Sequence, residues 1–208
     1  MYSRAESLKR LLTEIDSQKN GDIEVLTDID EGGVRTTGHK RNELLARARG
    51  EYVAFVDDDD MILPGYVPKI LEGIKTKPDV IGFRGYMTTN KTNRVNWIIS
   101  KDMPYELSKD EFGNPVYLRF NNHLSPVKKE IALQIGYPDK FIGEDYDYAV
   151  RLVESKLIKT EYFIDDFLYH YDFVHKGPQP AASKPSIRIK ERKVSRNYVQ
   201  PKSRRRFN

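Results

Sequence analysis

Apolar side chains along the first half of the chain recur at two spacings, one helical and one typical of strands. Ser3 and Glu6 have the spacing of a capping box, and leucine and isoleucine then recur three and four residues apart, which predicts a helix that ends at Asn20-Gly21. Short apolar runs predict strands at residues 23–26, 52–56 and 80–83, and helices are expected between them at about 39–49 and 64–74.

The second half shows a weaker pattern. Short strand-like pieces are expected at 86–88, 95–99 and 116–118, helices at 127–135 and from about 143, and two last strands at 160–164 and 167–171. Strands that alternate with helices indicate an α/β fold. We expect a mostly parallel, Rossmann-like central sheet flanked by helices, with a small irregular or antiparallel region after residue 83.

Composition excludes several classes of protein. With 38% hydrophobic and 11% aromatic residues among 208, the chain can form a real core, so wholesale disorder is excluded. There is no cysteine, which removes disulfides and thiolate chemistry and agrees with a cytoplasmic location. No apolar run approaches the roughly 18 residues that predict a membrane span, and the polar first residues do not resemble a signal peptide.

Charge divides the chain near Lys176. Residues 176–208 hold 11 lysines and arginines and one acid, Glu191, whereas residues 1–175 hold 24 basic and 30 acidic side chains. The prolines and sparse apolar residues of the tail favour a mobile segment. We therefore expect one domain at 1–175, with halves at 1–83 and 84–175, and a basic tail that either folds back on the acidic body or contacts DNA.

Four consecutive aspartates, Asp57 to Asp60, follow the strand expected at 52–56. Ligands of open α/β sheets bind beyond the carboxyl ends of strands. Adjacent carboxylates repel one another, and a divalent ion with oxygen ligands, Mg²⁺ or Mn²⁺, would relieve that repulsion. The alternative is a solvated acidic turn whose last residue caps the next helix.

Two further motifs lie at expected helix starts. Lys40 and Arg41 oppose the helix dipole there, which a bound phosphate would explain, although a basic surface turn is the alternative. Glu144 and Asp145 follow Gly143 and are electrostatically favourable at a helix start in any case. A carboxylate at this position would act as a general base if it reached an acceptor hydroxyl.

Together these motifs resemble glycosyltransferase family 2 enzymes with the GT-A fold. The segment GHKRNELLARARGEYVAFVDDDDMILP at 38–64 is similar to the family's nucleotide-sugar half, with its Arg-Asn, Ala-x-Gly-Glu-Tyr and Asp-x-Asp elements. Gly143-Glu144-Asp145, followed by Arg151, resembles the acceptor-side Glu-Asp motif. The similarity spans about residues 3–171 and is poor across 84–120. It implies a compact bacterial or phage type of enzyme.

The resemblance implies roles for individual residues. Asp145, with Glu144 as neighbour or substitute, matches the catalytic base of inverting members. Asp57 and Asp59 match the metal-binding acids of Asp-x-Asp. The implied nucleotide-sugar contacts are Asp28 or Asp30, Lys40, Arg41, Asp57 and Asp58. The implied donor is a nucleotide-diphosphate sugar, most simply a UDP-sugar, and the acceptor is a glycan or a modified nucleic acid.

Three other side chains are candidates for the same site. His170 is either an additional metal ligand or a packed strand residue, and His123 either lines an acceptor site or satisfies a buried turn. Trp97 either stacks on a sugar or belongs to the core. The family also opens with an apolar strand before its first helix, and Met1 to Ser3 correspond to the turn after it, so that strand is either missing here or supplied by another segment.

Two other functions fit parts of the pattern. A nucleotidyltransferase would share the fold and the metal, but it needs a glycine-rich and basic phosphate loop after a first strand. A degenerate GT-A module would bind nucleic acid or another polyanion through the basic tail. The missing first strand favours the degenerate module, whereas the presence of both Asp59 and Asp145 favours the glycosyltransferase.

Overall fold

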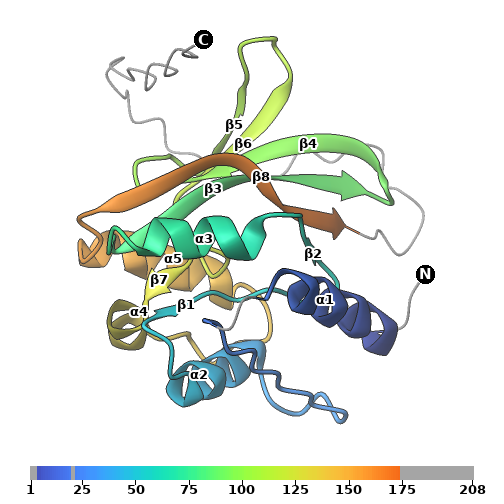
Figure 1. Ribbon diagram of the computed structural model, residues 1–208, viewed down its shortest axis with the longest axis vertical. Helices are drawn as coiled ribbons and strands as arrows, with labels where there is room; N and C mark the ends of the chain where they lie inside the picture. Colours follow the sequence, from blue (N-terminus) through green and yellow to red (C-terminus); the bar gives the residue numbers. More distant parts are fainter. Residues whose placement is uncertain (1–3, 20–21, 174–208) are drawn as a thin grey trace. The chain divides into compact units, whose positions relative to one another are not determined.

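A computed structural model describes residues 4–19 and 22–173 (Figure 1). The basic tail and its expected DNA contact lie outside the described residues. The helices are α1 (Arg4–Gln18), α2 (Thr37–Arg47), α3 (Tyr66–Ile74), α4 (Lys129–Ile135) and α5 (Glu144–Ser155). The strands are β1 (Tyr52–Val53), β2 (Met61–Ile62), β3 (Val80–Thr89), β4 (Thr92–Ile99), β5 (Glu106–Lys109), β6 (Pro115–Arg119), β7 (Val127–Lys128) and β8 (Glu161–Phe173).

These strands form one mixed sheet. Its order is β1-β7-β3-β4-β6-β5, while β8 runs along the other edge of β3 and carries β2. The β3–β8 and β4–β6 pairs are parallel, and the remaining pairs are antiparallel. The α/β class with flanking helices is confirmed. Parallel pairing is less extensive than predicted, because residues 23–26 form no strand and the 86–99 region is a hairpin of β3 and β4.

Helices cover the sheet through two hydrophobic clusters. In the first, α1 and α3 pack against β3, β4 and β8, and in Figure 1 α3 lies across the face of β3 and β8. In the second, α2, α4 and α5 pack around Val80 of β3 and Val127 of β7. The aspartate run follows β1, and both clusters include residues of the segment that leads to it, Phe55 in the second and Val56 in the first.

Trp97 belongs to the first cluster. It is 1% exposed and lies against Phe83 and Tyr169, with ring centroids 5.8 and 6.0 Å away. Gly85 permits this packing, since a Cβ there would lie 2.1 Å from the indole. The expectation that Trp97 stacks on a sugar is therefore wrong, and the core alternative holds.

Several expected elements have different bounds. The two last strands are the single strand β8, and the helix expected at 127–135 begins as the short strand β7. Strand β5 was not expected, since its sequence has little apolar content. Residues 23–26, expected as a strand, have no strand partner among the described residues. In the part of the chain described here, no helix is long and apolar enough to cross a membrane.

Candidate active site

Helix α2 is fixed against residues 137–140, which precede α5, by a close backbone approach and by hydrogen bonds. The Thr36 side chain caps the helix by accepting a hydrogen bond from the His39 backbone N–H (3.0 Å). Gly38 then approaches so closely that a Cβ would lie 1.8 Å from the Pro138 carbonyl oxygen. Asn42 donates to the Tyr137 carbonyl and accepts from the Tyr137 N–H, at 2.9 and 2.8 Å. Arg41, on the same turn, is thereby held inside the protein.

Arg41 is the cation at the centre of the site. It is 7% exposed, its Nη2 donates to Asp57 Oδ1 (2.8 Å), and its Nε donates to Glu144 Oε1 (3.2 Å). Its guanidinium also lies over the rings of Phe55 and Tyr137, 5.2 and 5.8 Å from their centroids. Arg41 therefore joins the aspartate run to the start of α5, and its donors are directed to carboxylates of the protein.

His123 provides a second link between the same two segments. Its backbone carbonyl accepts from the Phe55 N–H (2.9 Å), which fixes the residues just before the aspartates. Its Nε2 lies 3.4 Å from Asp57 Oδ2, and its Nδ1 lies 3.8 Å from Asp145 Oδ2. His123 is 7% exposed and lies between two carboxylates of the protein. The structure therefore does not support the expected contact of His123 with an acceptor.

The electrostatics of Asp57 follow from these contacts. Burial opposes its ionisation, but His123 and Arg41 outweigh that effect and hold the pKa of Asp57 well below its usual range. Asp57 is therefore an anion with both oxygens engaged.

Glu144 and Asp145, at the start of α5, differ in their exposure to solvent. Gly143 has a φ of 81°, a left-handed conformation that turns the chain into the helix. Glu144 is 5% exposed and holds Arg41, whereas the side chain of Asp145 is 42% exposed beside His123. Of the two, Asp145 is accessible to an acceptor hydroxyl.

The other aspartates of the run also differ from one another. Asp58 accepts two hydrogen bonds from the Arg4 guanidinium of α1, and Asp59 is exposed. Asp60 is 4% exposed, accepts from the Tyr169 hydroxyl (2.7 Å), and leaves its Oδ1 without a hydrogen-bond partner among the described residues. Burial, together with the charges of Asp57 and Asp59, raises the pKa of Asp60 to about 8 despite the hydrogen bond from Tyr169.

The run fits a divalent ion by its chemistry, although it does not enclose one. Desolvation by the surrounding protein, and then the charge of Asp58, raise the pKa of Asp59, and a bound cation would offset that effect. Among the described residues, no three His, Asp or Glu side chains are arranged to hold a metal. An ion at Asp59 would therefore take most of its oxygen ligands from a bound diphosphate.

His170 is not positioned to share such an ion. Its Nε2 lies 2.8 Å from Thr88 Oγ1, and its ring stacks on Tyr86 with centroids 4.5 Å apart. Its neighbour Tyr169 points to the opposite face of the sheet, where it contacts Asp60. The interpretation of His170 as a metal ligand is wrong, and that of a packed strand residue holds.

The acids expected at the nucleobase lie in the loop before α2. Arg35 donates to Asp28 (2.8 Å), and the Arg35 backbone N–H donates to Asp30 (2.8 Å). Both carboxylates therefore organise this loop. Lys40 is half-buried on α2 beside the buried Arg41. These three contacts with a nucleotide sugar stay predictions.

Residues beside Asp145 that the sequence did not indicate form an aromatic group. Tyr105 lies 5.3 Å from both Phe120 and Tyr146 between ring centroids, and Tyr146 is 48% exposed. Arg4 and Tyr169 were likewise missed, although each holds a member of the aspartate run. Their partners lie more than fifty residues away in sequence, so no local pattern indicates them.

Comparisons with known proteins agree with this geometry. The model of glycosyl transferase family 2 matches residues 30–134, half of the chain, which includes α2, the aspartate run and His123. The chain belongs to this family. An uncharacterised glycosyltransferase from Methanocaldococcus jannaschii is 25% identical over 170 residues, covering 78% of this chain and 53% of that protein.

Solved structures of TarS residues 1–349 from S. aureus share the fold. One covers 83% of this chain and 58% of that chain, with a TM-score of 0.56 and 16% identity. A TarS complex with UDP-GlcNAc gives a TM-score of 0.55 at 14% identity, covering 86% and 58%. A complex with UDP gives 0.57 at 15% identity, covering 83% and 58%. The chain thus spans little more than half the length of these relatives.

Proposed function

We propose that this protein transfers a sugar from a nucleoside diphosphate-sugar to a hydroxyl acceptor, with inversion at the anomeric carbon. The observation that carries the proposal is the buried link from Asp57 through Arg41 and His123 to Glu144 and Asp145. It brings the expected donor-side and acceptor-side motifs, 88 residues apart in sequence, to one place. Family membership and the UDP and UDP-GlcNAc complexes of TarS support a UDP-sugar as donor.

The donor diphosphate would lie at the exposed end of the aspartate run. Asp59, with Asp57 or Asp58, would hold Mn²⁺ or Mg²⁺ there, and such an ion neutralises charge on a leaving diphosphate. Asp57 is already an anion, so it can attract a cation without first losing a proton. The pairing of Arg41 with Asp57 and Glu144 makes Arg41 a positioning residue, and the half-buried Lys40 beside it would be the cation that contacts the diphosphate.

The acceptor would approach Asp145. In a single displacement, the acceptor oxygen bonds to the anomeric carbon, the bond to the diphosphate oxygen breaks, and the acceptor proton passes to Asp145. His123 lies on the buried side of Asp145, with its Nδ1 3.8 Å from Asp145 Oδ2. The exposed ring of Tyr146 offers a face on which an acceptor sugar can stack. Tyr146→Ala should raise KM for the acceptor and leave donor hydrolysis unchanged.

The test is a panel of nucleotide sugars assayed for hydrolysis and transfer with Mn²⁺, with Mg²⁺ and with a chelator. We expect one donor to be turned over only with a divalent ion. Asp59→Asn should abolish this turnover, whereas Asp166→Asn, an exposed carboxylate on β8 paired with Lys69, should leave it unchanged. Turnover that persists in chelator, or in Asp59→Asn, would remove the ion from the proposal.

A further inference from the structure

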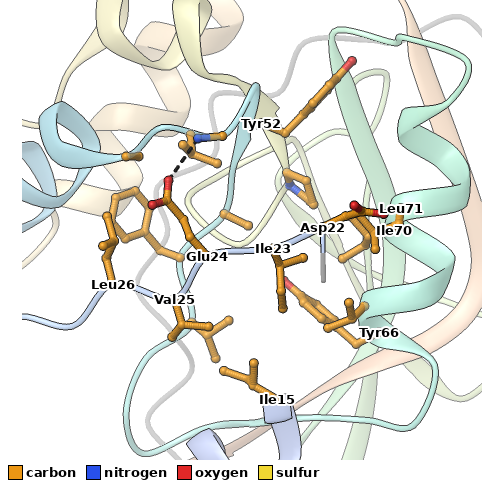
Figure 2. A pocket seen from close by; sticks show the side chains of 18 of the residues that line it. Ile15, Asp22, Ile23, Glu24, Val25, Leu26, Tyr52, Tyr66, Ile70 and Leu71 are labelled. Carbon is orange, nitrogen blue, oxygen red and sulfur yellow. Dashed lines mark hydrogen bonds between the residues drawn. The ribbon is translucent and has the colours of Figure 1, made fainter. Parts of the chain in front are cut away.

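Two surfaces near the aspartate run differ in chemistry. The first is an apolar groove of about 930 Å³ between α1, residues 22–27 and α3. Figure 2 shows Ile23 and Leu26 on one side of this groove and Ile70 and Leu71 on the other. The second is the face of the sheet around the end of β6, which carries tyrosines and an arginine. A polar ligand fits the second surface better, because a polar group that is buried without a hydrogen-bond partner costs free energy.

Arg119, the last residue of β6, lies on the same face of the sheet as the first hydrophobic cluster. The strand register pairs Tyr117 with Trp97 and Arg119 with Ile99. Trp97 and Ile99 are 1% and 0% exposed and belong to that cluster. Because the side chains of a strand alternate between the two faces of a sheet, Tyr117 and Arg119 point to the face of the cluster. Arg119 is only half-buried, so the cluster does not cover it completely.

The guanidinium of Arg119 has aromatic neighbours and no acidic partner. Its central carbon lies 5.9 Å from the ring centroid of Tyr105 and 5.7 Å from that of Tyr117. Within the described part of the chain, no carboxylate pairs with Arg119, whereas Arg4 and Arg41 each pair with an aspartate. No nitrogen of Arg119 is a buried atom without a hydrogen-bond partner, so its unpaired N–H groups face solvent. The guanidinium is therefore free to donate to a ligand.

The charges around Tyr171 show that Arg119 lies on the side of the sheet where the aspartate run is. Burial, and then the charges of Asp60 and Asp59, raise the pKa of Tyr171, whereas the charge of Arg119 lowers it. Because the effect of a charge weakens with distance, the Tyr171 hydroxyl is close to acids of the run and to Arg119. Arg119 thus faces the candidate site without being neutralised by it.

A row of side chains connects Asp145 to Arg119. The ring of Tyr146, the residue after Asp145, is 48% exposed and lies 5.3 Å from the ring of Tyr105 between centroids. Tyr105 in turn contacts the guanidinium of Arg119. An acceptor that places its hydroxyl at Asp145 and extends along these rings therefore reaches Arg119.

We propose that Arg119 binds a phosphate or carboxylate group of the acceptor, and that the acceptor is a glycan carrying such an acidic group. A guanidinium recognises either group through paired N–H donors in one plane. A nucleic acid would need several cations along its backbone, whereas the described neighbours of Arg119 are tyrosine rings. The inference rests on the proposed sugar transfer, since it names the class of acceptor that Asp145 would activate.

Binding to Arg119 can be measured without turnover, by nuclear magnetic resonance of the full chain. The side-chain Nε–H resonance of Arg119 is assigned by its loss in Arg119→Gln, and glucuronate, glucose 6-phosphate and glucose are titrated in turn. We expect saturable shifts with the two anions and no shift with glucose, and the tighter anion identifies the acidic group. Arg94 is the matched control, because its guanidinium also lies over two rings, Tyr86 and Phe167, at 4.1 and 4.8 Å. Its resonance should not move.

Transfer onto the same three sugars tests the role of Arg119 in turnover, with the donor that the protein hydrolyses. We expect the KM of the better anionic acceptor to be about tenfold or more below that of glucose, because charge-assisted hydrogen bonds are strong. Arg119→Gln should remove this preference, and Arg119→Lys should retain part of it, since lysine keeps the charge but loses the planar fork. Arg94→Gln should keep the preference of the parent.

The outcomes separate this inference from the proposed function. Donor turnover without a preference for an anionic acceptor, or without a shift at Arg119, would overturn the inference alone, whereas absence of donor turnover would overturn the proposed function as well. A loss of UDP affinity in Arg119→Gln would assign the arginine to the donor diphosphate. A DNA oligonucleotide that shifts the Arg119 resonance at lower concentration than either anionic sugar would assign it to nucleic acid. Either of these two results would overturn the choice of an acidic glycan.

Discussion

The two sides of the aspartate run are held in different ways. On the side of α2 and α5, Asp57 is tied by Arg41 and His123, both of which are buried. On the side of α1, Asp58 is tied by Arg4, whose side chain is 79% exposed. Ion pairs of buried side chains fix geometry, whereas an exposed ion pair does so weakly. The side of α2 and α5 is therefore held more firmly than the side of α1.

Substitution of Asp145 is expected to have the largest effect, and the quantity affected is the rate of sugar transfer. Asp145→Asn keeps the shape of the side chain but cannot accept the acceptor proton, so transfer should fall by about 10²–10⁴-fold. Tm should change little, since the side chain is half-exposed. The matched control is Asp147→Asn in the same helical turn, whose carboxylate faces Lys140. Equal losses in rate for the two variants would remove Asp145 as the base.

Substitution of Arg41 tests whether the contacts between the aspartate run and α5 depend on this buried cation. Arg41→Gln leaves Asp57 and Glu144 without their partner, and breaking a buried ion pair costs roughly 3–5 kcal/mol. Urea unfolding should show this loss, and Glu144→Gln in addition should recover part of it. Arg47→Gln, at an exposed position of the same helix, should stay within about 0.5 kcal/mol of the parent. A stable Arg41→Gln protein would contradict the account of this network.

Asp60 predicts a dependence of stability on pH. Its folded pKa of about 8 lies above its ordinary value. Below about pH 4 both states carry the proton, and between pH 4 and 8 only the folded state retains it. Stability should therefore fall as pH rises through that window, by roughly 3–4 kcal/mol between pH 5 and 8. Asp60→Asn should flatten the slope of Tm against pH, and an unchanged slope would place the titration elsewhere.

Arg4 should give the smallest effect. Its contact with Asp58 is an exposed ion pair, and such pairs contribute at most about 1 kcal/mol. Arg4→Gln should therefore shift Tm by no more than a few degrees, and added salt should reduce the difference further. A large loss of stability on this substitution would show that the α1 side is as firmly assembled as the Arg41 side.

Sequence reasoning succeeded where local pattern decides structure. Helix α1 and the start of α5 follow from apolar periodicity and from Gly143, and the aspartate run follows a strand as predicted. Sequence reasoning failed where the structure of a segment depends on contacts with residues far away in the sequence. Residues 23–26 have the composition of a strand but no described neighbour to pair with, so composition alone did not produce one. For Trp97 and His170 the sequence left a ligand role and a packed role open, because a sequence does not reveal which face of a strand is buried.

The candidate site divides in the same way. The acids were predictable as a group from their spacing, but their separate roles depend on contacts across the fold. Glu144 and Asp145 are adjacent, yet one is buried on Arg41 and the other faces solvent.

Calorimetric titration with UDP tests most directly whether the aspartate run is the donor-binding edge. We expect one site per protein with Mn²⁺ present and none in chelator. Binding should be lost in Asp59→Asn and retained in Asp145→Asn, because only the former carboxylate is assigned to the diphosphate and its ion. UDP that binds Asp59→Asn as tightly as the parent, or that fails to bind the parent with Mn²⁺, would contradict the account.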